Sequence, residues 1–287
     1  MAKRRASIPV NPMANQFGAG IAIEKLLVEK LLPKEKEEAG RPHREDGHSF
    51  FLLEKGKVSI EIDFEKYNIK PSSLLYLHPN QVHRITAFEN VTVCVWSIRN
   101  EHLQPEYLKI LEELTPTSPL LLKKDAVSLL SDAVSLGMRL FDRKEDKLYH
   151  AAIKDSCNAL VALAISQFLG HTTSTQKLSR FETVAKSFRN LLERNYTTDK
   201  RPAVYAKKLN ISIPYLNECV RHATGFSVSH HIQQRVILEA KRLLSHSDQA
   251  IKEIAAELGY DDYPYFSRLF TKVVGKTPVA FRNKNLD

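Results

Sequence analysis

Hydrophobic and polar residues alternate with a period of two in the first hundred residues of the chain. The segment from Val58 to Phe64 changes between apolar and polar side chains at every step, which is typical of a strand with one buried face. Short apolar runs at Leu74–Leu77 and Val91–Trp96 indicate further strands. The expected turns between strands lie at Gly47, Gly56, Pro71, Pro79 and Asn80. This pattern predicts a small antiparallel barrel or sandwich.

From about residue 106 the hydrophobic period becomes helical. Helices are predicted over Lys123–Asp142 and Leu148–Leu169, with Gly170 as the C-terminal stop of the second. In the second helix the residues expected in the core are Ile153, Cys157, Leu160, Ala164 and Phe168. The polar stretch His171–Gln176 is expected to be a linker, and everything after it is expected to be helices joined by short turns.

The chain of 287 residues is long enough for more than one domain core. We expect an α+β multidomain protein with three parts. Residues 1–105 form the β-barrel, 106–176 form a helical connecting region with the linker, and 177–287 form an all-α module.

The C-terminal part contains a weak internal repeat. Tyr205–Ile211 parallels Ile254–Tyr260 with an offset of 49 residues, and Gly225 parallels Gly275 with an offset of 50. In each copy a short helix carries a small residue, Ala206 or Ala255, at the point where a second helix must cross closely.

A tight turn is expected after each short helix. Asn210 and Gly259 can adopt the positive φ that such a turn requires. Ser212 is the candidate N-cap of the next helix in the first copy, and Asp261 or Asp262 in the second. That next helix is expected to bury Leu216 and Val220 in the first copy, and Phe266, Leu269 and Phe270 in the second. Both copies therefore have the helix-turn-helix pattern, whose second helix enters the major groove of DNA.

A single helix is predicted between the two copies, because Ile232, Val236, Ala240 and Leu244 recur at four-residue spacing. Two recognition helices held about 34 Å apart can contact adjacent major-groove segments on one face of a duplex.

The net charge of +9 is concentrated at the same end of the chain. Residues 181–287 contain 17 Lys and Arg against 11 Asp and Glu, a net charge of +6, while the other 180 residues contribute +3. A basic module of this kind suits a polyanionic partner. The three cysteines, Cys94, Cys157 and Cys219, form no CxxC pair, so neither a disulfide framework nor a zinc site is expected. With no signal peptide and no apolar run of about 18 residues, we expect a soluble cytoplasmic protein without membrane contact.

The C-terminal motifs resemble those of AraC/XylS-type transcription regulators. The resemblance is carried by Ile254–Tyr260, Tyr265–Phe270, Gly275–Pro278 and Phe281–Arg282, with Ala240–Leu244 in the helix between the units. It covers about residues 185–283, and many positions agree at the correct spacing. It implies a bacterial, sequence-specific DNA-binding protein that regulates transcription.

The resemblance also implies which residues face the DNA. They are Ser212, Pro214, Asn217, Glu218 and Arg221 in the first unit, and Asp262, Tyr263, Pro264, Ser267, Arg268 and Lys272 in the second. Asn217 could pair with adenine, and Arg268 could pair with guanine or hold a phosphate. Glu218 departs from the family pattern, in which a basic residue is common there. Tyr265 and Phe266 are expected in the core.

The N-terminal motifs resemble a cupin-type sensor domain over about residues 20–100. The likeness lies in Pro42–His48, the strand Val58–Phe64 and Pro79–His83. It implies a pocket for a small effector, such as a sugar or a related metabolite, with His43, His48 and His83 as candidate pocket residues. Trp96 is expected in the core.

Cupin enzymes bind a metal ion through clustered histidine and glutamate. Here His43, Glu45, His48 and His83 are the available ligands, but the closely spaced His-x-His of metal-binding cupins is absent. We therefore expect no metal, no cofactor, no catalytic residues and no enzyme activity.

These expectations combine into a one-component regulator. The effector changes the arrangement of a homodimer joined through the connecting helices, and so alters operator binding and recruitment of RNA polymerase. One alternative is a metal-dependent cupin enzyme with an appended DNA-binding tail. Another is a DNA-binding protein whose barrel binds no ligand and responds to a partner protein.

Overall fold

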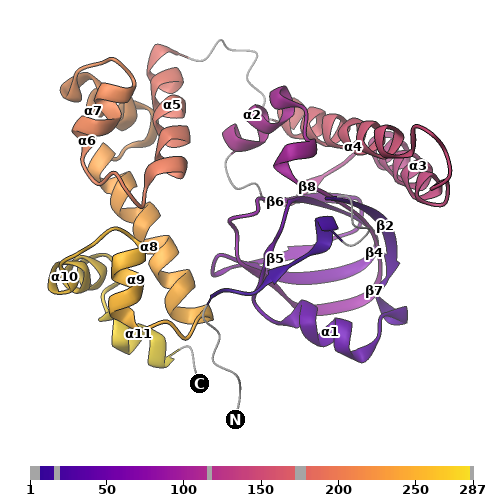
Figure 1. The fold of residues 1–287 in the computed structure, drawn as a ribbon, viewed down its shortest axis with the longest axis horizontal. Helices are drawn as coiled ribbons and strands as arrows, with labels where there is room; N and C mark the ends of the chain where they lie inside the picture. Colours follow the sequence, from indigo (N-terminus) through magenta and orange to yellow (C-terminus); the bar gives the residue numbers. More distant parts are fainter. Residues whose placement is uncertain (1–6, 16–19, 115–117, 172–178, 285–287) are drawn as a thin grey trace. The chain divides into compact units, whose positions relative to one another are not determined.

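The computed structural model describes residues 7–15, 20–114, 118–171 and 179–284. They belong to two compact units, one formed by residues 9–173 and one containing residues 174–287. We call these the N-terminal unit and the C-terminal unit (Figure 1). None of the described helices is both long and apolar enough to cross a membrane. The predicted linker His171–Gln176 lies outside the described residues, except for His171, which ends a helix.

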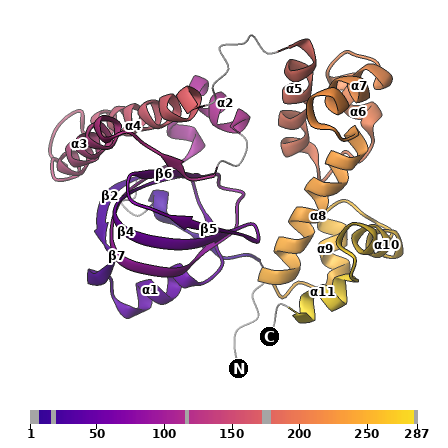
Figure 2. The ribbon, with the colours of Figure 1, turned by 180° about the vertical axis from the view of Figure 1, so that it is seen from behind.

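The N-terminal unit is built around a six-stranded antiparallel sheet. Its strand order is β2-β7-β4-β6-β8, and β5 pairs with β4 beside this path. The strands are β2 (Ile21–Leu27), β4 (His48–Ile62), β5 (Glu65–Ile69), β6 (Ser73–Leu77), β7 (His83–Ile98) and β8 (Leu120–Leu121). Figure 2 shows how strongly the long strands β4 and β7 curve. The expected sheet-rich N-terminal domain is therefore present.

A second, parallel pair of strands lies beside this sheet. It consists of β1 (Val10–Asn11) and β3 (Arg44–Glu45). An isolated antiparallel bridge connects His43, the residue before β3, to His83, the first residue of β7. This bridge places His43 directly opposite His83.

The structure corrects two predictions, a turn at Gly56 and a strand that extends to Phe64. Gly56 lies inside β4, at a break in the β4–β7 register, with a φ of +83°. A β-carbon there would lie 2.2 Å from the Glu89 carbonyl oxygen, so glycine permits close approach of the two strands. Phe64 is not in the strand predicted for it. It forms the β4–β5 hairpin turn with Asp63, and both have positive φ.

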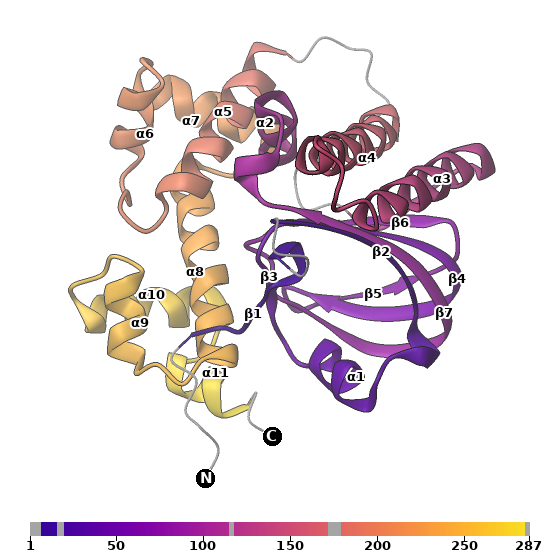
Figure 3. The ribbon, with the colours of Figure 1, turned by 45° about the vertical axis from the view of Figure 1, so that its right-hand side comes forward.

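Helices cover the sheet on two sides. Figure 3 shows α3 (Lys124–Phe141) and α4 (Tyr149–His171) side by side along the sheet, with α1 (Pro33–Gly40) on the opposite side. The remaining helical segments are η1 (Met13–Asn15), η2 (Val28–Lys30), η3 (Asn100–His102) and α2 (Pro105–Glu113). The two predicted long helices are confirmed, but α4 continues through Gly170 instead of stopping there.

The sheet and the helices α2 to α4 share one hydrophobic core. Trp96 is fully buried and stacks on Phe50, with ring centroids 5.4 Å apart. All five core positions predicted in α4 are buried. Gly137 allows α3 to approach β2 closely, because a β-carbon there would lie 2.8 Å from Ile23 Cδ1.

The C-terminal unit is entirely helical in the part described. Its helices are α5 (Arg180–Asn195), α6 (Pro202–Lys208), α7 (Ile213–Thr224), α8 (Val228–His246), α9 (Ile251–Glu257), α10 (Tyr263–Val274) and α11 (Pro278–Lys284). The long helix α8 runs between the group α5–α7 and the group α9–α11 (Figure 1).

Candidate functional site

The first helix-turn-helix consists of α6 and α7. Asn210 in the turn has a φ of +53°, as predicted. The Ser212 hydroxyl caps α7 by accepting a hydrogen bond from the Tyr215 backbone N–H. Gly225 ends α7 in the left-handed conformation. The chain therefore turns sharply twice, and α7 is presented between the two turns.

The second helix-turn-helix, α9 and α10, repeats this construction. Gly259 has a φ of +77° in the turn, and Gly275 ends α10 with the same φ. Of the two aspartates that could cap α10, the structure selects Asp262, whose Oδ1 accepts from the Tyr265 N–H at 3.0 Å. Asp261 is exposed beside it.

Each pair of helices is held by its own core. In the first helix-turn-helix, α5 packs against α7, and the rings of Phe188 and Tyr205 lie edge to face with centroids 5.3 Å apart. In the second unit Phe270 lies edge to face with Phe281 of α11 at 5.5 Å. The apolar residues predicted to be buried in α7 and α10 are buried: Leu216, Val220, Phe266, Leu269 and Phe270.

The helix α8 connects the two helix-turn-helix units as predicted. The four apolar residues that recur along it, Ile232, Val236, Ala240 and Leu244, are buried. The helix also carries buried charge. The Arg235 guanidinium lies 3.8 Å from the Tyr196 ring centroid and donates to Glu193 of α5 at 2.7 Å. At the other end, Arg282 of α11 donates to the Leu244 carbonyl at 3.3 Å. Charged and polar contacts thus hold α8 against α5 beside the first helix-turn-helix and against α11 beside the second.

A second connection joins the two helix-turn-helix units directly. A β-carbon on Gly259 would lie only 1.9 Å from the Thr197 carbonyl oxygen. Beside this contact, Lys200 Nζ donates to the carbonyls of Tyr196 and Thr197 and lies 5.0 Å from the Tyr260 ring centroid. Burial of the ammonium lowers the pKa of Lys200 to about 8. The loop after α5 is therefore packed against the turn of the second unit.

Most of the side chains predicted to contact DNA are accessible. The exposed ones are Ser212, Pro214, Glu218, Arg221, Asp262, Pro264, Arg268 and Lys272, while Asn217, Tyr263 and Ser267 are half-buried. The placement of Tyr265 in the core is wrong. This side chain is 50% exposed and stacks on Tyr260, with centroids 5.9 Å apart.

The Asn217 amide has partners inside the unit. Its Oδ1 accepts from the Val228 N–H at 3.2 Å, and its Nδ2 donates to the Ile213 carbonyl at 3.3 Å. A bidentate contact with adenine needs both groups, and here Oδ1 connects α7 to the start of α8 while Nδ2 is bonded within α7. The helical pattern alone gave no signal for this role.

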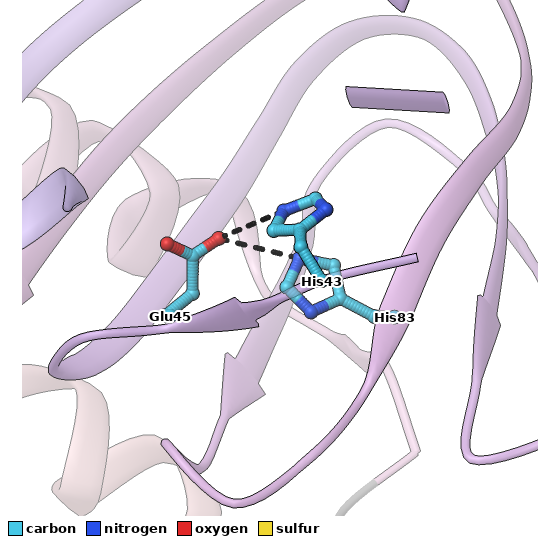
Figure 4. Close-up of side chains that lie close together, drawn as sticks. All are labelled: His43, Glu45 and His83. Atoms are coloured by element: carbon cyan, nitrogen blue, oxygen red, sulfur yellow. Dashed lines mark ion pairs between the residues drawn. The ribbon is translucent and has the colours of Figure 1, made fainter. Parts of the chain in front are cut away.

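A buried histidine cluster lies in the N-terminal unit. Glu45 Oε1 is 3.4 Å from His43 Nε2 and 3.3 Å from His83 Nε2 (Figure 4). Burial raises the pKa of the Glu45 carboxyl, but the two facing imidazoles outweigh it and bring the pKa down to about 2. Burial lowers the pKa of His83, whereas the contact with Glu45 leaves the pKa of His43 raised despite burial.

His48, the third predicted pocket residue, belongs to a different cluster. Its Nε2 donates to Asn100 Oδ1 at 2.9 Å, so its Nδ1 accepts from the Tyr76 hydroxyl at 2.8 Å. Burial, reinforced by His78, lowers the pKa of His48 to about 3. The structure thus pairs His43 and His83 with Glu45, which sequence reasoning considered only as a metal ligand. The spacing His43-x-Glu45, in an extended segment, was the available signal.

Both parts of the chain match known families. A model of the AraC-like ligand binding domain matches residues 35–153, and a model of a helix-turn-helix domain matches residues 205–284.

Curated relatives match in a limited segment. HTH-type transcriptional activator RhaR of Yersinia pseudotuberculosis (strain IP 31758) is 41% identical over 69 residues, which is 24% of this chain and 24% of the relative. The RhaR protein of Enterobacter sp. (strain 638) is 32% identical over 94 residues, 33% of this chain and 32% of the relative. The matches span about a quarter to a third of the length of these relatives.

Solved structures are also similar. The C-terminal domain of AraT, a response regulator from Geobacillus stearothermophilus, has a TM-score of 0.35 at 29% identity, covering 37% of this chain and 88% of that one. ToxT from Vibrio cholerae O395 has a TM-score of 0.41 at 16% identity, covering 83% and 88%.

Proposed function

We propose that this chain, which matches an AraC-like ligand-binding domain ahead of a helix-turn-helix domain, is an AraC-type regulator that binds operator DNA through both helix-turn-helix units under the control of a small organic effector. The effector binds in the N-terminal unit and belongs to the sugars or related metabolites. The protein acts as a homodimer and recruits RNA polymerase.

One observation carries the DNA-binding proposal. Two helix-turn-helix units of matching construction are fixed to one helix, α8, and each presents an exposed recognition helix. Arg221 on α7, and Arg268 and Lys272 on α10, are exposed, and no described residue forms an ion pair with them. Cations without a protein partner at the surface of a recognition helix suit contacts with phosphates and bases.

The side chains divide into three roles in this proposal. Arg221 and Arg268 contact guanine edges or phosphates, and Glu218 accepts a hydrogen bond from a cytosine amino group. Pro214, Tyr263, Pro264 and Ser267 form the apolar and polar surface against the groove, with Lys272 on a phosphate. Ser212, Asp262 and Asn217 hold the recognition helices in place.

The effector controls binding through its difference in affinity between two arrangements of the dimer. Only the arrangement in which both protomers reach their half-sites binds the operator tightly. The helices of the region 106–176 supply the dimer contact.

The test is to isolate genomic fragments bound by the full chain and then to measure operator affinity by fluorescence anisotropy. Arg268→Ala should weaken operator binding by about 1–3 kcal/mol. Lys70→Ala, which removes an exposed positive charge from the N-terminal unit outside the region 106–176, is the matched control and should bind like the wild type. Unchanged affinity in folded Arg268→Ala protein, or equal losses in both variants, would contradict the assignment.

Salt dependence gives a second measure in the same assay. The logarithm of the association constant should fall linearly with the logarithm of the salt concentration, because phosphate contacts release counterions. Lys272→Ala should reduce the slope by about one if Lys272 neutralises a phosphate.

A further inference from the structure

The backbone brings His43, Glu45 and His83 together. His43 and His83 exchange two backbone hydrogen bonds of 3.0 Å across their bridge, so their side chains lie opposite each other. His43 and Glu45 are two residues apart in an extended segment and therefore face the same side. Figure 4 shows the three side chains converging, with Glu45 directed at both rings.

The hydrogen bonding of His43 determines the state of its ring. Its Nδ1 lies 2.7 Å from the Arg41 carbonyl oxygen. A carbonyl only accepts, so Nδ1 carries the hydrogen. In a neutral ring, Nε2 then directs a lone pair at the Glu45 carboxylate, and such a contact needs a cation between the two atoms. Donation of the remote N–H to a carbonyl is also the usual arrangement of a metal-ligating histidine.

The distances distinguish the two cations that could occupy this position. A proton shared between imidazolium and carboxylate usually gives a separation of about 2.7–2.9 Å. The observed separations of 3.4 Å and 3.3 Å are longer. Two ligand atoms at about 2.1 Å from a tetrahedral ion lie about 3.4 Å apart.

A further observation points to a missing partner. The second carboxylate oxygen of Glu45, Oε2, is buried and forms no hydrogen bond with any described residue. The Glu45 side chain is 1% exposed. A buried carboxylate oxygen is costly without a donor or a cation.

We propose that His43, Glu45 and His83 bind one divalent first-row transition-metal ion through His43 Nε2, His83 Nε2 and the Glu45 carboxylate, whose Oε2 would gain from the ion the partner that it lacks among the described residues. One ligand atom from each residue already lies within 4.8 Å of the other two. Two imidazoles and a carboxylate suit Zn²⁺ and its neighbours in the series. Three protein ligands leave a coordination position for water or a small molecule.

His48 does not belong to this site, because both of its ring nitrogens have protein partners. The proposal is independent of DNA binding, and the experiment below measures ion binding alone.

The test is calorimetric titration of Zn²⁺ into the full-length protein, freed of metal with a chelator and kept reduced so that its cysteines remain thiols. The wild type should bind one ion per chain at this site. Glu45→Gln and His83→Gln should weaken this binding by more than about 100-fold. His150→Gln, which removes an exposed histidine of the same unit, should bind Zn²⁺ like the wild type.

Folding of each variant is checked by the fluorescence of Trp96, which is buried in the core of this unit. If Glu45→Gln fails to fold, His43→Gln provides the same test at the most exposed of the three side chains, 12% accessible. Co²⁺ in the wild type should give visible absorption bands that Zn²⁺ abolishes by competition. The proposal is overturned if the wild type binds no ion, or if the folded Glu45→Gln or His43→Gln variant binds Zn²⁺ as tightly as the wild type.

Discussion

The ionisable side chains of the two candidate sites, one in each unit of the chain, lie in opposite environments. In the N-terminal unit, His48 and the group formed by His43, Glu45 and His83 are buried or nearly so. In the C-terminal unit, Arg221, Arg268 and other cations of the recognition helices are exposed. Burial shifts pKa values, whereas exposure leaves charges screened by salt.

This difference indicates how each unit should respond to conditions. The stability of the N-terminal unit should depend on pH, because burial lowers the pKa of His48 in the folded unit and unfolding removes this effect. The DNA affinity of the C-terminal unit should depend on salt. Trp96, the one tryptophan of the sequence, lies in the N-terminal unit, so its fluorescence follows that unit separately from the total helical signal.

The largest expected effect concerns the backbone of the C-terminal unit. Gly259→Ala should lower the free energy of unfolding of this unit by about 3–4 kcal/mol. Alanine is strained at the positive φ of this position, and its β-carbon would also clash with the Thr197 carbonyl. Gly275→Ala is the matched control, since Gly275 has the same φ but no atom within 4 Å of the added β-carbon. It should cost about 1–2 kcal/mol.

Both variants are measured by urea unfolding followed by circular dichroism. The Trp96 fluorescence transition should be unchanged in both. A shift in that transition would mean that the N-terminal and C-terminal units do not unfold independently. Equal decreases in the free energy of unfolding of the two variants would show that the Thr197 contact has no effect.

The next effect is the pH dependence of the N-terminal unit. The pKa of His48 falls from its ordinary value of 6.5 to about 3 on folding, so between these values the unfolded chain binds more protons than the folded one. The free energy of unfolding should therefore decrease as the pH falls, by about 1.4 kcal/mol per pH unit from this residue.

His48→Gln tests this sign. The variant should be less stable than the wild type at pH 7.5, and the difference should shrink by about 2–3 kcal/mol between pH 6.5 and pH 4.5. Urea unfolding followed by Trp96 fluorescence measures both proteins. If the free energies of unfolding of the two proteins changed equally with pH across this range, His48 would not change its protonation on unfolding.

The smallest effect concerns the cap of α10. Asp262→Ala should cost about 1 kcal/mol of stability in the C-terminal unit, because the Tyr265 N–H loses its acceptor. Asp261→Ala, at the exposed neighbouring carboxylate, should change stability by less than about 0.5 kcal/mol. Thermal unfolding of the two variants side by side decides which aspartate caps the helix, and a reversed order would contradict the structure.

Local patterns were sufficient where the determining contacts lie within a few residues. The helix α8, the positive φ of Asn210 and Gly259, and the Ser212 cap depend on periodicity and turn chemistry, and each was predicted correctly. The turn predicted at Gly56 was wrong because Gly56 lies against the distant Glu89 of β7, which the local pattern does not contain. Phe64 and Tyr265 were misplaced for local reasons, because Phe64 turns with Asp63 and Tyr265 stacks on Tyr260.

The sequence by itself determined the two helix-turn-helix units, the helix between them and the sheet-rich domain before them, because these follow from hydrophobic period, turn residues and caps. Only the tertiary structure decided that His43 and Glu45 meet His83, forty residues away, while His48 joins Tyr76 and Asn100. It also decided that Asn217 is engaged by α8 and that Thr197 packs against Gly259. Such contacts depend on strand register and helix packing, which no short segment of the chain specifies.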